Sequence, residues 1–521
     1  MHIASPLTTE SEPCLQWIEL ASSFQIPGLY IIGLPAPEVA EARERIRAAI
    51  DASGFEFPKR RLLINLSPAS IKKRGTGLDL AMALAVLSST SSAPLPGTVA
   101  AWGELGLDGS LKPSGQLARS LFAAWKAGVQ YFLLAEAELK EARRVRHLIQ
   151  ESREFSLPPP ILMAASNLKT LWNRLAGGNF RELHELDELN EEVPPESALF
   201  EDSPALLPIS PSLKRTLCTS AAGAHHLLLL GPRGSGKTHA LDWLIALQPS
   251  LSKASELKNR LVSELSGLPL PSHLKIPIRR VGPQVRPAAL TGGSFQGALK
   301  AGDFSLAHGG LLIADEFPEW ARDSREALRD PLERGKVCIN RIHVSVELPA
   351  RFTLAATGNF CPCGGTPLQF PRALQSSSQT GDTGCRCKKS VKENYLARLS
   401  GPVLDRLDLV SFLLPTPASA REIKTDLASL QEKVVSTQQT LIHTYGDIPS
   451  RLNSKEIDDF ALRKKSVGRI LDLSPLSSFR SRHKTIRVAM TLAALDEETE
   501  IKDYHLQEAL FYRPERLGLF S

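Results

Sequence analysis

The residues with the clearest chemistry in this 521-residue sequence form one short run of glycines and polar side chains. The run is Gly231-Pro232-Arg233-Gly234-Ser235-Gly236-Lys237-Thr238, which fits the pattern G-x-x-x-x-G-K-[ST]. An apolar stretch over 225–230 precedes it and a helical stretch over 240–247 follows, as a phosphate-binding loop requires. Backbone N–H groups of such a loop surround the phosphates, Lys237 reaches the β- and γ-phosphates, and the Thr238 hydroxyl ligates Mg²⁺. The run therefore predicts a site for ATP and Mg²⁺ rather than a glycine-rich turn.

Hydrolysis of a nucleotide also needs carboxylates beside the metal, and a second apolar run supplies them. The stretch over 310–314 ends in Asp315 and Glu316. Asp315 is expected to hold the metal, directly or through water, and Glu316 to activate the attacking water as general base. Alone, this run is more simply a strand that ends in a solvated acidic turn. Its position downstream of the phosphate loop favours the catalytic interpretation.

One arginine farther along the chain could reach the active site of a neighbouring subunit. Arg406 lies in the segment 400–408, and its cation would offset the charge on the transferring oxygens of a nucleotide held by another subunit. From spacing alone, an ordinary surface salt bridge is the simpler interpretation of Arg406.

Four of the seven cysteines are clustered as two Cys-x-Cys pairs, Cys361 with Cys363 and Cys385 with Cys387. Four thiolates match the tetrahedral coordination of a structural Zn²⁺, and such a metal would close the Ser- and Gln-rich loop within 361–387. One residue between paired cysteines is tighter than the usual two to four. Reduced buried thiols and a redox-labile pair are therefore alternative interpretations.

The composition limits the classes of protein to which the chain can belong. With 42% hydrophobic and 23% charged residues, it is typical of a globular protein, and its length suggests three or four domains. The net charge of +6 permits a nucleic-acid partner without requiring one, because charge must be clustered to steer binding. The low cysteine content excludes a disulfide-stapled secreted scaffold. No secretory signal or membrane-spanning run is visible, so we expect a cytoplasmic protein without a membrane partner.

Changes in composition divide the chain into three blocks and a linker. The first block, 12–177, alternates predicted strands with predicted helices and indicates an α/β domain. Its strands are expected over 29–32, 61–66 and 131–134, and its helices over 37–50 and 79–87. The segment 178–205 is acidic and contains two adjacent prolines, which is typical of a solvated linker. The block 206–415 carries the phosphate-site residues, and a helical block, 416–521, follows.

Motifs throughout the chain resemble the ComM/YifB family of magnesium-chelatase-like AAA+ ATPases. They lie at 33–35, 43–49, 53–58 and 103–105 in the first block, and at 305–310, 331–333, 361–364 and 398–402 beside the phosphate site. The resemblance covers 27–177 and 206–515. It implies an α/β fold with an N-terminal Lon-protease-like (S5-like) α/β domain, an AAA+ P-loop core with a parallel sheet, and a C-terminal helical lid.

The same resemblance implies a function. Family members are ATP-driven hexameric motors that act as DNA helicases and promote branch migration and strand integration during natural transformation. The implied partners are further copies of the chain, single-stranded and branched DNA, and recombination proteins. A chelatase-like ATPase that remodels a protein partner is the alternative.

Four residues take their site roles from the resemblance. Asn359 matches the sensor-1 asparagine, which orients the attacking water, and Arg406 matches the arginine finger. The segment 478–489 matches the sensor-2 helix, in which we favour Arg480 as the nucleotide contact, with Arg487 second.

The first block resembles a peptidase fold but lacks the residues for peptidase chemistry. A catalytic Ser and Lys are needed as a pair. Gly77 stands where the serine would be, and Ala118 stands where the lysine would be. The expected result is a domain without peptidase activity that binds DNA or builds the ring. The run Lys72-Lys73-Arg74 is expected to contact phosphate or to form a solvated basic loop.

Basic residues near the ATPase core suggest where DNA would bind. The segment 336–346 alternates around Asn340 and Arg341 and predicts a hairpin. In related motors a hairpin here lines the pore, so Arg341 and His343 are expected to contact phosphates without reading sequence. Arg286, in a second pore-loop candidate over 279–300, and Lys388, beside the cysteine cluster, are the other expected DNA contacts.

Overall fold

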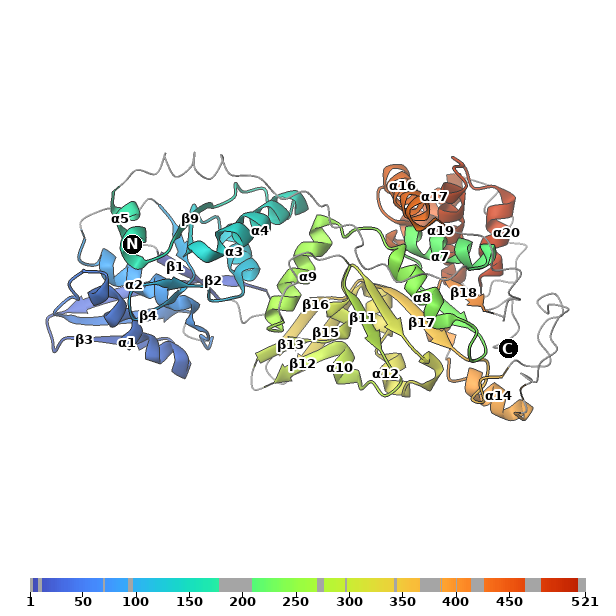
Figure 1. Cartoon of the computed structure of the whole chain (residues 1–521), viewed down its shortest axis with the longest axis horizontal. Helices are drawn as coiled ribbons and strands as arrows, with labels where there is room; N and C mark the ends of the chain where they lie inside the picture. Colours follow the sequence, from blue (N-terminus) through green and yellow to red (C-terminus); the bar gives the residue numbers. More distant parts are fainter. Residues whose placement is uncertain are drawn as a thin grey trace.

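The computed structural model describes residues 3–7, 12–68, 71–91, 97–177, 209–268, 276–295, 298–341, 344–365, 385, 387–399, 401–413, 426–463 and 479–513. Two α/β regions lie next to each other, and a group of helices follows at the carboxyl end of the chain (Figure 1). The expected acidic linker, 178–205, lies outside the described residues. None of the described helices combines the length and apolar character needed to cross a membrane.

A seven-stranded mixed sheet organises the amino-terminal region, in the order β3-β4-β2-β1-β5-β8-β9. The strands are β1 (Ile3–Leu7), β2 (Cys14–Ser23), β3 (Gly28–Ile32), β4 (Arg61–Ser67), β5 (Val99–Ala101), β8 (Tyr131–Ala135) and β9 (Ile161–Ala165). β2 is antiparallel to β1 and β4, whereas the other neighbours are parallel. The three expected strands are thus confirmed. β1 precedes the expected boundary at residue 12 and occupies the middle of the sheet.

Helices cover this sheet because their apolar residues face it. They are α1 (Pro37–Ala52), α2 (Asp79–Ser88), α3 (Leu117–Lys126), α4 (Leu139–Ser152) and α5 (Leu168–Ala176), and a short pair, β6 (Glu104–Leu105) and β7 (Leu111–Lys112), connects α2 to α3. Both expected helices are confirmed. Every residue of α2 is buried, as its nearly continuous apolar sequence predicts. Its one carboxylate, Asp79, pairs with Arg45 at 2.7 Å.

A five-stranded parallel sheet, in the order β11-β14-β17-β10-β18, forms the second region. Its strands are β10 (Leu227–Leu230), β11 (Ile278–Val281), β14 (Leu311–Ala314), β17 (Thr353–Gly358) and β18 (Leu409–Phe412). The helices around it are α7 (Pro211–Gly223), α8 (Lys237–Ala246), α9 (Lys253–Leu265), α10 (Pro287–Thr291), α11 (Asp303–Leu306), α12 (Arg322–Glu326), α13 (Arg329–Arg334), α14 (Lys389–Leu396) and α15 (Gly401–Leu404). The parallel order places the carboxyl ends of these strands at one edge.

Two hairpins extend from this region. One pairs β12 (Gly292–Phe295) with β13 (Ala298–Ala301), and the other pairs β15 (Lys336–Arg341) with β16 (Val344–Pro349). The second is the hairpin expected over 336–346.

The carboxyl-terminal helices share a core with the parallel sheet. They are α16 (Leu427–Tyr445), α17 (Ser454–Arg463), α19 (Phe479–Leu495) and α20 (Asp503–Phe511). Val434 of α16 and Val488 of α19 are fully buried in the same cluster as Leu217 of α7 and Leu229 of β10. This helical group, hereafter the lid, therefore packs onto the parallel-sheet region through α7.

Helix α9 joins the two α/β regions, and Figure 1 shows it between α3 and α4 on one side and the parallel sheet on the other. Leu257 of α9 is fully buried in the amino-terminal core. The buried Glu264 carboxylate accepts hydrogen bonds from the backbone N–H groups of Ala118, at 2.9 Å, and Arg119, at 2.8 Å, in the first turn of α3. These N–H groups have no partner within their own helix. An element of the parallel-sheet region thus completes the start of a helix in the amino-terminal region.

Candidate nucleotide site

Three loops that follow adjacent strands meet at the carboxyl edge of the parallel sheet. β10 leads into the phosphate loop 231–238, β14 leads into Asp315 and Glu316, and β17 leads into Asn359. β17 pairs with both β10 and β14, so the three loops are neighbours. Ligands of open parallel sheets bind at this edge.

The Lys237 ammonium group lies at the centre of these loops. Its Nζ donates to the carbonyl oxygens of Gly231 and Pro232, each at 2.8 Å, and to Asn359 Oδ1 at 3.0 Å. Burial lowers the pKa of Lys237, and the charge of Glu316 opposes that shift. The structure therefore brings together Lys237 and Asn359, which the sequence separates by more than a hundred residues.

The backbone of the phosphate loop bends where glycine permits it. Gly234 and Gly236 have φ angles of 73° and 88°, in the left-handed region that side chains disfavour. Gly236 caps the start of α8, and Thr238 follows in the first turn with its side chain exposed. The start of α8 thus directs its N–H groups toward the loop, and Thr238 lies in the same first turn.

A threonine that the sequence analysis missed organises the two carboxylates. Thr357 Oγ1 donates to Asp315 Oδ1 at 3.3 Å and accepts the backbone N–H of Glu316 at 3.2 Å. Glu316 has a φ of 49°, an uncommon conformation for a residue with a side chain. Residues held in such an uncommon backbone conformation are frequent at active sites. Thr357 precedes Asn359 by two residues on β17, and that spacing was the available signal.

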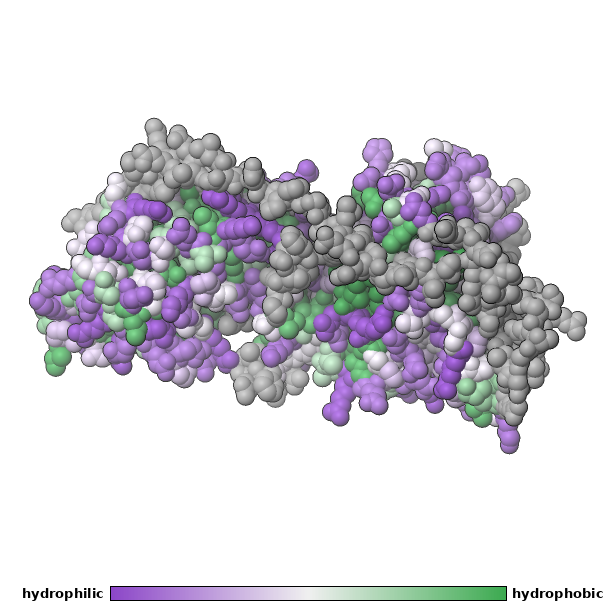
Figure 2. Space-filling view, in the orientation of Figure 1, coloured by the Kyte–Doolittle hydropathy of each residue, from purple (hydrophilic) through white to green (hydrophobic). Residues whose placement is uncertain are grey.

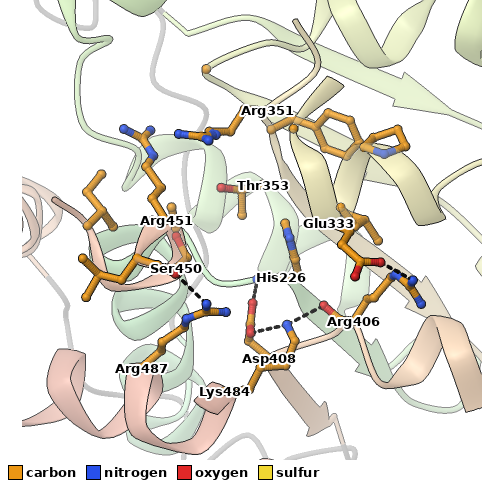
Figure 3. A pocket seen from close by; sticks show the side chains of 18 of the residues that line it. His226, Glu333, Arg351, Thr353, Arg406, Asp408, Ser450, Arg451, Lys484 and Arg487 are labelled. Atoms are coloured by element: carbon orange, nitrogen blue, oxygen red, sulfur yellow. Dashed lines mark hydrogen bonds and ion pairs between the residues drawn. The ribbon is translucent and has the colours of Figure 1, made fainter. Parts of the chain in front are cut away.

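Arg406, Arg480 and Arg487 lie away from this edge. Arg406 precedes β18, which runs parallel to β10, so the four-residue strands separate it from the phosphate loop by about 13 Å. All three arginines line a cavity of about 620 Å³ between the parallel sheet and the lid. Figure 3 shows Arg406 beside Glu333 on one side of this cavity and Arg487 on the other.

Glu333, at the end of α13, connects two of these arginines. Its Oε2 accepts from Arg406 at 2.5 Å, and its Oε1 accepts from Arg480 at 2.6 Å. Arg487 instead donates to the Leu452 carbonyl oxygen at 2.6 Å, and burial lowers its pKa. Arg406 and Arg480 therefore share one surface, and Arg487 is engaged within the lid.

A buried ion pair fixes the backbone next to Arg406. Lys484 of α19 donates to Asp408 Oδ1 at 2.5 Å and to the Arg406 carbonyl oxygen at 2.7 Å, while Asp408 Oδ2 accepts the His226 backbone N–H at 2.9 Å (Figure 3). Burial alone would raise the pKa of Asp408, but Lys484 and the two adjacent histidines outweigh it and hold the pKa below its usual range. Nothing in the local sequence pattern predicted this pair.

The four clustered cysteines converge, as their spacing predicted. All four sulfurs lie within 4.8 Å of one another, with Cys361 Sγ at 2.9 Å from Cys363 Sγ and at 3.1 Å from Cys385 Sγ. These separations are longer than a disulfide bond and shorter than the roughly 3.8 Å between thiolates around one tetrahedral Zn²⁺, so the sulfurs would move slightly apart to hold the ion. The donor set fits Zn²⁺. Residues 366–384 of the intervening loop lie outside the described part.

The first cysteine pair also touches the phosphate loop. The Arg233 backbone N–H donates to the Gly364 carbonyl oxygen at 2.9 Å. Cys361 follows Asn359 by two residues. The cysteine cluster is therefore attached to two of the three loops of the nucleotide site.

The expected DNA contacts are dispersed over the surface. Arg286 is exposed at the start of α10, and Lys388 is exposed before α14. Arg341 ends β15, but its side chain and the whole of His343 lie outside the described part. The expectation of a solvated basic run is wrong for Lys73. This residue is buried, and its Nζ donates to the Pro68 carbonyl oxygen. Burial lowers the pKa of Lys73.

Other groups occupy the two positions where peptidase residues would stand. A Cβ atom on Gly77 would lie 2.4 Å from the Trp102 ring, and the Trp102 indole N–H donates to the Gly115 carbonyl oxygen at 2.8 Å. Ala118 is fully buried in the first turn of α3, beneath the Glu264 carboxylate. Gly77 thus has no room for a side chain while Trp102 is in place.

Comparison with known proteins agrees with this architecture. Family models described as "Subunit ChlI of Mg-chelatase", "Magnesium chelatase, subunit ChlI" and "Magnesium chelatase, subunit ChlI C-terminal" match residues 18–138, 210–420 and 425–513. A stretch of 97 residues, 18% of this chain, is 33% identical to 12% of the Lon protease of Clostridioides difficile.

Two relatives match nearly end to end. The competence protein ComM of Haemophilus influenzae is 31% identical over 98% of this chain and 96% of its own length. The protein YifB of Salmonella typhimurium is 30% identical over the same shares. The P-loop core, the Lon-like region and the helical lid all lie within these matches, and the chain belongs to the ComM/YifB family of magnesium-chelatase-like AAA+ proteins.

Proposed function

We propose that this chain is an ATPase whose hydrolysis site is the carboxyl edge of the parallel sheet. The observation that carries the proposal is the convergence of Lys237, Asp315, Glu316 and Asn359 there. Lys237 would bind the β- and γ-phosphates with the N–H groups of 231–238, and Thr238 and Asp315 would hold Mg²⁺, which supplies charge neutralisation when bound. Glu316 would take the proton of the attacking water, and Asn359 would orient that water.

We propose that Arg406 and Arg480 act on a nucleotide held by another copy of the chain. Arg406 lies about one strand length from its own phosphate loop, and Arg480 shares the Glu333 carboxylate with it, so both would face away from the ATP of the same subunit. A ring, with six copies as the family resemblance implies, would place this surface against the next phosphate loop. Arg487, which is engaged with the Leu452 carbonyl oxygen, is the weaker candidate for a nucleotide contact.

Mixing two inactive variants tests this assignment to the neighbouring subunit. Arg406→Ala keeps its phosphate loop, and Lys237→Ala keeps its arginine. Mixed rings contain interfaces with both groups intact, so ATPase activity should reappear on mixing, whereas each variant alone should lose about three orders of magnitude. No recovery in rings shown to be mixed would place Arg406 in the active site of its own subunit.

We propose that ATP hydrolysis drives movement on DNA in the cytoplasm, in the manner of a competence-related branch-migration helicase. Full-length similarity to ComM supports this proposal, as do exposed cations at Arg286 and Lys388. Single-stranded or branched DNA would be the substrate, and recombination proteins would be partners. Remodelling of a protein partner is the second candidate, and the family's chelatase relatives are its only support.

Branch migration of a synthetic three-way junction tests this function. The wild-type chain should resolve the junction with ATP, and its ATPase rate should rise with single-stranded or forked DNA. Lys237→Ala should abolish both effects, whereas Lys169→Ala, an exposed lysine on α5, should change neither. An ATPase that DNA does not stimulate would refute the DNA motor and leave the protein-remodelling alternative.

We also propose that Cys361, Cys363, Cys385 and Cys387 hold a structural Zn²⁺. Their sulfurs lie within the reach of a single ion, and the cluster adjoins the nucleotide site through Gly364 and Arg233. Purified protein should contain about one zinc per chain by elemental analysis. Absence of metal after purification without chelators, with all four thiols reactive, would favour free cysteines.

A further inference from the structure

Within the part of the chain that the structure describes, one face of the amino-terminal sheet is exposed at β2, β4 and β3. Burial alternates along these strands, so that Ile18, Leu62 and Ile64 face the core while the residues between them face outward. Three large outward-facing side chains are substantially exposed: Trp17 at 38%, Tyr30 at 43% and Ile32 at 45%. A single exposed apolar side chain is ordinary, but a set of them on one sheet face marks a binding surface.

The strand register arranges these side chains in rows. Trp17 lies opposite Ser67, Ile32 is in the row of Glu19 and Asn65, and Tyr30 is in the row of Ala21 and Leu63. Successive rows are two residues apart, or about 6.7 Å.

The row of side chains continues into the loops at both ends of β3. Phe24 and Ile26, between β2 and β3, are 92% and 82% exposed, and Leu34, after β3, is 56% exposed. In Figure 2, green hydrophobic residues interrupt the mostly hydrophilic surface around this end of the amino-terminal region.

Arginines lie against the aromatic rings on this face. The Arg61 guanidinium group is 4.9 Å from the centre of the Tyr30 ring, and that of Arg60 is 5.1 Å from the centre of the Phe24 ring. Lys72 is exposed just beyond the other end of β3, where Pro35 bridges to Lys73. Glu19, the acidic side chain within these rows, accepts a hydrogen bond from Asn65 at 2.7 Å. Cations therefore flank the exposed rings at both ends.

This combination favours nucleic acid over a protein partner. Aromatic residues and arginine are enriched at protein interfaces as well, whereas lysine is depleted there, so the exposed Lys72 is the cation that distinguishes the two partners. Proteins that bind single strands combine aromatic stacking platforms, often on a sheet, with arginines and lysines that contact the phosphates. Stacking tolerates any base sequence, as a motor that moves along DNA requires.

We propose that the exposed face of β2, β4 and β3 binds single-stranded DNA, with Tyr30 and Trp17 stacking on bases and Arg60 and Arg61 contacting phosphates. The inference rests on the proposed action on DNA and assigns that action a second contact surface outside the ATPase core. Lys72 extends the phosphate track past β3.

Binding of a fluorescein-labelled dT30 oligonucleotide by the full-length chain tests the proposal through fluorescence anisotropy. Tyr30→Ala should weaken binding about tenfold or more, the effect of losing one stacking platform. The double change Arg60→Ala and Arg61→Ala should also reduce the salt dependence of binding. Tyr504→Ala, which removes a comparably exposed tyrosine from α20, should leave affinity unchanged. Fluorescence of Trp17 should be quenched by dT30, so Trp17→Phe should lose that part of the quenching.

The outcomes separate this inference from the proposed function. If the wild-type chain binds dT30 and DNA stimulates its ATPase, yet Tyr30→Ala and the double arginine variant bind as well as wild type, the sheet face is refuted and the DNA motor stands. If Tyr30→Ala instead changes the oligomeric state without changing DNA affinity, the face is an interface between copies. If the wild-type chain binds no DNA at all, the proposed function itself fails. Unchanged basal ATPase rates and circular dichroism spectra would exclude misfolding of the variants.

Discussion

The Glu264 carboxylate makes the contact between α9 and α3 depend on pH. Burial raises the pKa of Glu264 to about 7, against the opposing effect of two backbone N–H groups, Arg119 and Arg260. Glu138, which faces it, also has its pKa raised to about 7 by burial and by the charge of Glu264. Near neutral pH, protonation of these two carboxyl groups therefore stabilises the contact between the two regions.

The sign and size of the effect follow from proton linkage. An exposed glutamate titrates near 4.5, so the stability that docking gains from a protonated Glu264 is fully present below that pH and is lost as pH rises through about 7. At about 1.4 kcal/mol per pKa unit, the loss between pH 5.5 and 8.5 is about 2 kcal/mol. For a region of this size it corresponds to roughly 4–8 °C in the unfolding midpoint.

Glu264→Gln tests this reasoning because the amide stays neutral at every pH and resembles the protonated acid. Calorimetric unfolding at pH 5.5 and 8.5 should show a smaller loss of stability in Glu264→Gln than in the wild-type chain. Glu151→Gln, at the exposed end of α4, should keep the wild-type difference. If Glu264→Gln loses as much stability with rising pH as the wild type does, the carboxyl is ionised when docked, and the N–H groups and arginines outweigh burial.

Three further predictions concern the ATPase core. Glu316→Gln should lower ATP turnover by about 10²–10⁴-fold while leaving binding of a fluorescent nucleotide intact, since it removes only the base; a parallel loss of binding would contradict that role. Asp408→Asn should destabilise the chain by about 3–5 kcal/mol in urea unfolding, because Lys484 loses its buried partner, and a change under 1 kcal/mol would show that the pair is dispensable. Cys385→Ser should release zinc and reduce ATPase activity, because the cluster supports Arg233 and Asn359; zinc release with full activity would uncouple the two sites.

The sequence predicted those parts of the nucleotide site that directly follow a strand along the chain. Each of the segments 225–238, 310–316 and 354–359 is an apolar strand followed by polar residues, and a parallel sheet brings such strand ends together. For Thr357 the only signal in these segments was its position two residues before Asn359, because a threonine inside a strand is otherwise ordinary.

Contacts between distant elements were not predictable in this way. Glu264 and Ala118 are separated by 146 residues, and Lys484 and Asp408 by 76. Charge patterns do not specify such partners. Lys73 was misjudged for a related reason: a basic run is usually solvated, but the β-bridge to Pro35 turns this lysine inward.

The packing of Trp102 over Gly77 constrains the evolutionary history of the amino-terminal region. A serine at position 77 would collide with the indole, so Trp102 would have to become smaller first. Truncating a buried tryptophan costs about 3–5 kcal/mol, a large fraction of the stability of a domain. Introducing a peptidase serine at position 77 would thus begin with a step that confers no activity and weakens the fold. Trp102 therefore closes the single-substitution route to a serine at position 77.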